Sequence, residues 1–154
     1  RSCIPGRPGS PIPESERMAA KIGAGADFFT TQILFSTAEI DDLWQDFASR
    51  RPDLLATPLL ISLCPVRKVE NLAFLRYLGV HVPDDMENAL RSAPAEECLE
   101  QSLQILCRLQ EQILDKAQQI DDLATPGWNI APVGSIPGAA VLDLIRRLPT
   151  SVSR

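Results

Sequence analysis

One amide side chain stands out in this sequence because of its apolar surroundings. Gln32 lies within residues 28–35, a run in which every other residue is apolar or β-branched. Such a run predicts a buried strand covered on both faces, as in a parallel sheet. A buried amide must find partners for two donor hydrogens and one acceptor oxygen. Because ligands of α/β sheets bind beyond the carboxyl ends of strands, Gln32 is the first candidate for a ligand contact. The alternative is that neighbouring backbone groups satisfy it.

A carboxylate and an ammonium precede this strand at a spacing that places them on one side of a helix. Glu14 and Lys21 are seven positions apart, which is two turns of the helix predicted from Pro13 to Ile22. Two charges on one face can serve a polar ligand, whereas the alternative is a solvated helix face. The residues alone do not decide between these interpretations.

The histidine and the cysteines favour structural roles. His81 lies between two valines before Pro83, and no acid or nucleophile is near it in sequence, so we expect a turn residue. The cysteines at positions 3, 64, 98 and 107 form no CxxC pair. We therefore predict no metal site, expect buried free thiols, and infer a reducing, cytoplasmic compartment.

The apolar spacing predicts strands that alternate with helices. Further strands are expected over residues 59–63 and 128–133, and residues 36–39 (STAE) predict a capping box that opens the next helix. Other helices are predicted over residues 69–78, 84–92, 95–120 and 137–147. The apolar stripe of residues 95–120 favours packing against the sheet, with a coiled-coil seam as the alternative. Residues 1–12 are rich in Pro and Gly and predict a loop.

Length and composition indicate one globular domain. The 154 residues are 45% hydrophobic and 23% charged, and the net charge is −5. The basic residues are scattered, which argues against nucleic acid and anionic lipid as partners. No apolar run approaches the roughly 18 residues of a membrane span, and we expect no membrane partner.

The spacing of these motifs resembles the methylenetetrahydrofolate reductases, which are flavin-dependent TIM barrels. Residues 14–32 are similar to a helix with a spaced acid and lysine followed by K-x-x-A-G-A-[DN]-x-x-x-T-Q, with Thr31 in register before Gln32. Residues 58–66 resemble the strand P-x-x-x-G-[IL]-x-P-[VI], and residues 79–83 the turn G-V-x-[IV]-P. The similarity extends from about Ile12 to about Leu90. Ser36 departs from the family's usual aspartate, and the strand at Asn129 departs from H-F-Y-T-L-N.

The resemblance implies roles for five residues. Gln32 and Thr31 would lie at the folate substrate, and Leu75 falls near the position where some members place an aromatic residue against it. Glu14 and Lys21 would hold the ribose and phosphate region of FAD. The implied activity is FAD-dependent reduction of 5,10-methylenetetrahydrofolate to 5-methyltetrahydrofolate, with NAD(P)H or another donor reducing the flavin.

Only about three to four βα units are predicted, whereas a TIM barrel closes with eight strands. We therefore expect residues 1–154 to form the carboxyl-terminal half of a barrel, with residues 1–12 as a loop or the remnant of a preceding strand. No catalytic residue is assigned, because the resemblance places the general acid and most flavin-ring contacts in the other half. Either the chain is a fragment of a reductase, or it is a non-catalytic half-barrel that docks on a separate amino-terminal half or forms a homo-oligomer. Another TIM-barrel enzyme with an amide at a strand end is a third alternative.

Overall fold

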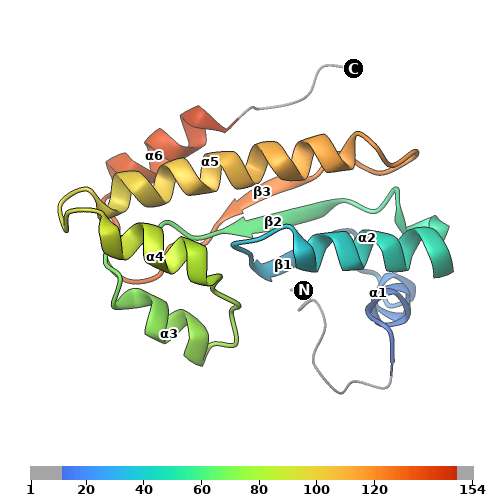
Figure 1. Ribbon diagram of the computed structural model, residues 1–154. Helices are drawn as coiled ribbons and strands as arrows, with labels where there is room; N and C mark the ends of the chain where they lie inside the picture. Colours follow the sequence, from blue (N-terminus) through green and yellow to red (C-terminus); the bar gives the residue numbers. More distant parts are fainter. Residues whose placement is uncertain (1–11, 149–154) are drawn as a thin grey trace.

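The computed structural model describes residues 12–148, and within this range three parallel strands form one sheet. The strands are β1 (Phe29–Ile33), β2 (Leu59–Leu63) and β3 (Gly127–Ile130), in the order β1-β2-β3. Parallel strands alternating with helices confirm the predicted fold class (Figure 1). Strand β3 ends before the predicted Val133, because Pro132 has no N–H with which to extend the ladder.

Six α-helices and one short 3₁₀-helix surround the sheet within the described range. They are α1 (Glu14–Gly23), α2 (Ala38–Arg50), η1 (Pro52–Leu54), α3 (Asn71–Tyr77), α4 (Asp84–Ser92), α5 (Cys98–Ala117) and α6 (Gly138–Arg147). Helix α5 is shorter than predicted: the chain turns after Ala117 and reaches a positive φ of 61° at Asp122. The predictions for residues 1–11, including Cys3, lie outside the described residues.

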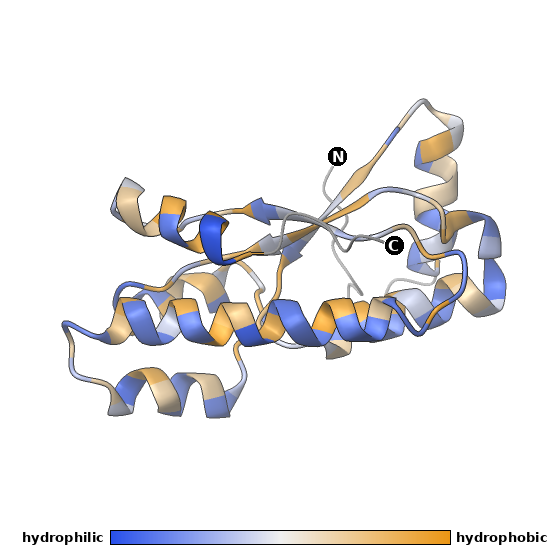
Figure 2. Ribbon diagram, turned by 90° about the horizontal axis from the view of Figure 1, so that it is seen from above, coloured by the Kyte–Doolittle hydropathy of each residue, from blue (hydrophilic) through white to orange (hydrophobic). Residues whose placement is uncertain are grey.

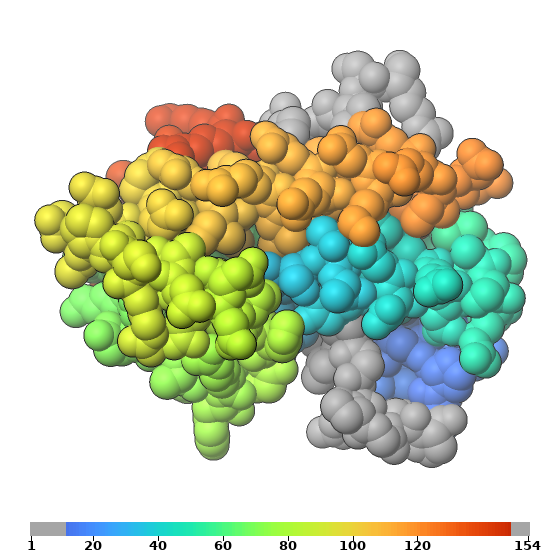
Figure 3. Space-filling view, in the orientation of Figure 1, coloured from blue at the N-terminus to red at the C-terminus, as the bar shows by residue number. Residues whose placement is uncertain are grey.

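One face of the sheet is covered by helices that share its core. Helices α2 and α5 lie in front of the sheet in Figure 1, and Figure 3 shows α2, α4 and α5 at the surface on this side. Polar and apolar residues alternate along α5 (Figure 2). Its buried side chains join those of β2 in one cluster, which includes Ile61, Leu63, Leu103, Leu106 and Ile113. Of the two alternatives for its apolar stripe, this supports packing of α5 against the sheet and not a coiled-coil seam. No helix within residues 12–148 combines the length and apolarity needed to cross a membrane.

The predicted capping box at the start of α2 is wrong. The N-cap residue is Thr37, and no side chain caps the helix. The Ser36 hydroxyl instead donates a hydrogen bond of 2.7 Å to the Glu39 carboxylate. A carboxylate is a strong acceptor for the hydroxyl hydrogen, so the two side chains bond to each other and neither accepts a backbone N–H at the start of the helix.

Helix α3 ends as its glycine predicts. Gly79 has a φ of 81°, which favours glycine, and its N–H donates to the Arg76 carbonyl. The carbonyl of Leu78, the residue before Gly79, accepts a hydrogen bond from a residue of the candidate site.

Candidate functional site

Gln32 lies near the carboxyl end of β1 and is half-buried rather than fully buried. Its Oε1 accepts the N–H of Ile33 at 3.0 Å, and its Nε2 donates to the Leu78 carbonyl at 3.4 Å. The expectation of a strand covered on both faces fails here, because Thr30 and Gln32, which alternate with the buried residues of β1, are only half-buried. Backbone groups therefore satisfy the amide oxygen, while the NH₂ group makes one long hydrogen bond within the described chain.

Thr31, the residue before Gln32 in β1, is buried, with 3% of its surface exposed. Its hydroxyl donates to the Gln32 carbonyl at 2.7 Å and accepts the N–H of Ser62 at 3.0 Å. The hydroxyl hydrogen is thus already used, so the geometry suits a residue that shapes the strand end. Direct contact of Thr31 with a ligand stays a prediction.

Helix α3 presents an apolar face to solvent near Gln32. Phe74, Tyr77 and Leu78 have exposed fractions of 50%, 84% and 45%, and the Phe74 and Tyr77 rings stack with centroids 6.4 Å apart. Leu75, which the resemblance placed near the folate, is fully buried in the core. Sequence reasoning missed Phe74, although exposed apolar residues at spacings of three and four on a short helix are the signal that could have found it.

The two residues predicted to hold a cofactor have different partners. Glu14 forms an ion pair with Arg17 at 2.9 Å. The Lys21 ammonium lies 5.8 Å from the centre of the ring of Phe29, which is the first residue of β1. Within residues 12–148 the structure shows no ion pair between Glu14 and Lys21. Lys21 is therefore near the amino end of the strand, while Gln32 is near its carboxyl end.

His81 has an acidic neighbour that is distant in sequence. Its Nδ1 lies 3.5 Å from Glu39 Oε1, while the other carboxylate oxygen of Glu39 accepts the Ser36 hydroxyl. The carboxylate thus separates the serine from the imidazole, so the histidine is not placed to take the serine proton. His81 is exposed in the loop between α3 and α4, in agreement with the predicted turn.

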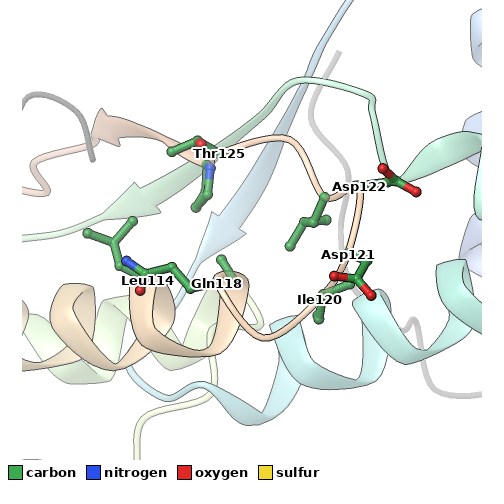
Figure 4. Close-up of a pocket in the computed structure, with 9 residues that line it drawn as sticks. Leu114, Gln118, Ile120, Asp121, Asp122 and Thr125 are labelled. Atoms are coloured by element: carbon green, nitrogen blue, oxygen red, sulfur yellow. The ribbon is translucent and has the colours of Figure 1, made fainter. Parts of the chain in front are cut away.

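Two cavities lie at different ends of the sheet. The cavity in Figure 4 has a volume of about 740 Å³ and is lined by the end of α5 and the loop before β3, including Leu114, Asp121 and Thr125. A second cavity of about 970 Å³ lies beyond the carboxyl end of β2 and is lined in part by Arg67, Lys68 and Arg91. Because α/β proteins bind ligands at the carboxyl ends of their strands, the second cavity is on the functional side of the sheet.

A family model for methylenetetrahydrofolate reductase matches residues 7–122 of the chain. The chain belongs to this family. Three parallel strands with alternating helices are therefore a part of the family's TIM barrel, as predicted. The amide of Gln32 lies at the edge where barrel enzymes of every chemistry place their active sites.

A solved structure of similar fold supports this architecture. An uncharacterized protein from Clostridium thermocellum, described as binding two copies of 5-methyl-5,6,7,8-tetrahydrofolic acid, aligns with a TM-score of 0.71 and 23% sequence identity. The alignment covers 96% of this chain and 50% of that chain, so the present chain spans half the length of that structure. The comparison with curated proteins finds no match.

Proposed function

We propose that this chain is the folate-binding half of a methylenetetrahydrofolate reductase-type enzyme. The full enzyme would reduce 5,10-methylenetetrahydrofolate to 5-methyltetrahydrofolate in one-carbon and methionine metabolism. The observation that carries the proposal is the Gln32 NH₂ group, held at the carboxyl edge of a parallel sheet in a member of this family. The folate-binding neighbour adds support. A cytoplasmic location, inferred from the cysteines, belongs to the same proposal.

The resemblance assigns Glu14 and Lys21 to one part of FAD, although Lys21 lies near the amino end of β1 and Gln32 near its carboxyl end. Lys21 can offer its ammonium to a phosphate, and Glu14 carries carboxylate oxygens that can accept ribose hydroxyls. When bound and reduced by NAD(P)H or another donor, FAD would supply the hydride that converts the methylene carbon to a methyl group. In this proposal the contacts to the flavin ring come from the other half of the barrel, as the resemblance implies.

Two further features of the carboxyl edge fit a folate. A pterin is planar, and the exposed ring of Phe74 offers it a π face that the buried Leu75 cannot offer. The carboxylates of a folate tail suit Arg67 and Lys68 in the cavity beyond β2. In this proposal Phe74 takes the role that the resemblance implied for Leu75.

Titration calorimetry of the 154-residue chain with 5-methyltetrahydrofolate tests the proposal. Replacing Gln32 with Ala should weaken binding about tenfold, because a ligand group that loses a buried hydrogen bond stays unsatisfied. Gln45, which is exposed on α2, provides the matched Gln45→Ala control and should bind as the wild type does. Equal affinities of the wild type and Gln32→Ala would remove Gln32 from the site.

A non-catalytic half-barrel is the second candidate function. Both outer strands of the sheet have an edge without a partner strand in the described range, and unpaired edges invite docking. A partner that carries the other half, or a second copy of this chain, could cover them. Wild-type protein that binds no folate in the calorimeter would favour this candidate over the first.

A further inference from the structure

Strand β1 contains one extra residue directly before its carboxyl end. Thr30 pairs with Leu60 and Ile33 pairs with Ser62, so β1 advances three residues while β2 advances two. Such a bulge interrupts the ladder and re-aims the side chains around it. The two residues within the bulge are Thr31 and Gln32. The orientation of Gln32 therefore depends on whatever holds the bulge in place.

Side chains replace the backbone hydrogen bonds that the bulge removes. The N–H of Ser62 donates to Thr31 Oγ1 at 3.0 Å, and Ser62 Oγ donates to the Thr31 carbonyl at 2.8 Å. Thr31 Oγ1 in turn donates to the Gln32 carbonyl at 2.7 Å. Thr31 and Ser62 are both 3% exposed, so water does not compete for these bonds. The backbone at Gln32 is thereby fixed from the neighbouring strand.

The third strand extends this network. Asn129 pairs with Ser62 across the sheet, and its Nδ2 donates to Ser62 Oγ at 3.0 Å. Since the single hydroxyl hydrogen of Ser62 goes to the Thr31 carbonyl, Ser62 can only accept a hydrogen from Asn129. This requirement sets which end of the Asn129 amide faces Ser62. Two paths of hydrogen bonds thus reach β1 from Ser62. One runs from Asn129 Nδ2 through Ser62 Oγ to the Thr31 carbonyl. The other runs from the Ser62 N–H through Thr31 Oγ1 to the Gln32 carbonyl, so together they fix both residues of the bulge.

We propose that Ser62 and Asn129 are positioning residues, which hold the bulge of β1 and so aim the Gln32 amide at the ligand without touching it. The ligand in this inference is the folate of the proposed function, on which it rests. Within residues 12–148 the Gln32 NH₂ group makes only its 3.4 Å bond to Leu78, so the network orients the amide and leaves a donor hydrogen for a ligand.

The first test follows Gln32 in the protein without ligand. Nuclear magnetic resonance of ¹⁵N-labelled protein reports its side-chain NH₂ signals and the exchange rate of the Ile33 amide, which donates to Gln32 Oε1. In Ser62→Ala and Asn129→Ala, we expect the NH₂ signals to move and the Ile33 amide to exchange about fivefold faster. Ser62→Thr keeps the hydroxyl and should restore the wild-type signals. Asn88→Ala, on the exposed surface of α4, is the matched control for Asn129. Unchanged Gln32 signals in both alanine variants would overturn the inference.

The second test measures coupling to the ligand. Ser62→Ala should weaken 5-methyltetrahydrofolate binding about fivefold on its own and have no further effect in the Gln32→Ala background. If Ser62 only stabilised the fold, the losses of folate affinity caused by Ser62→Ala and Gln32→Ala would instead add. If the wild type binds no folate, the proposed function fails, and the first test alone decides whether Ser62 and Asn129 position Gln32.

Discussion

At the residue scale, the Gln32 amide combines a fixed oxygen with a loosely held NH₂ group. Its Oε1 is bonded to the next residue in the chain, which orients the whole amide plane. The bond from Nε2 to Leu78 is long, so replacing it with a ligand acceptor costs little. The sequence predicted the position of this amide because one polar residue interrupts an apolar run. It could not predict the acceptor at Leu78, which is 46 positions away.

The same limit applies to other contacts between residues distant in sequence. Glu39 was expected to cap its own helix, but its carboxylate lies between Ser36 and His81. Spacing along a helix predicts which residues lie on the same face, as it did for the buried stripe of α5. It does not predict which loop folds back over the helix start, because that depends on the path of the whole chain.

Cys64 yields a prediction about stability at high pH. Burial raises the pKa of its thiol from 9.0 to about 11. Between these values the unfolded chain loses a proton that the folded chain keeps, so the free energy of unfolding should fall as the pH rises from 9 toward 11. Urea unfolding across this range should show an extra loss of about 2 kcal/mol in the wild type relative to Cys64→Ala. Parallel curves for the two proteins would show that the Cys64 thiol titrates in the folded protein as it does in the unfolded chain.

At the element scale, strands β2 and β3 make a close contact at Gly127, against the side chain of Leu60. A Cβ placed on Gly127 would lie 2.5 Å from Leu60 Cδ2, whereas Gly23 at the end of α1 has no atom within 4 Å of the same position. Sequence patterns predicted both strands from their apolar residues. They could not predict this close approach, because it depends on how Leu60 packs across the pair.

Gly127→Ala should therefore lower the free energy of unfolding by about 1 kcal/mol, since the Leu60 side chain must leave its preferred position. Gly23→Ala serves as the control and should leave stability unchanged or slightly higher, because it restricts only the unfolded chain. Urea denaturation measures both. Equal stability of the two variants would show that Leu60 adapts without cost.

At the scale of the whole molecule, the structure is an open part of a barrel. In the part of the chain that the structure describes, three strands leave an edge on β1 and another on β3, while TIM barrels close with eight strands. The sequence predicted this incomplete barrel from the number of strands and their order. The spacing of apolar residues in α3 did not by itself show which of them the core covers, and the structure leaves Phe74 and Tyr77 exposed.

We expect a folate to bind at the carboxyl edge of this sheet, next to Gln32. Titrating the ¹⁵N-labelled 16.9 kDa protein with 5-methyltetrahydrofolate locates the site directly, because each amide signal reports its own surroundings. We predict that the Gln32 NH₂ signals and the amides of α3 around Phe74 shift most. Shifts confined to the cavity between the end of α5 and the loop before β3, or no shifts at all, would contradict folate binding at Gln32.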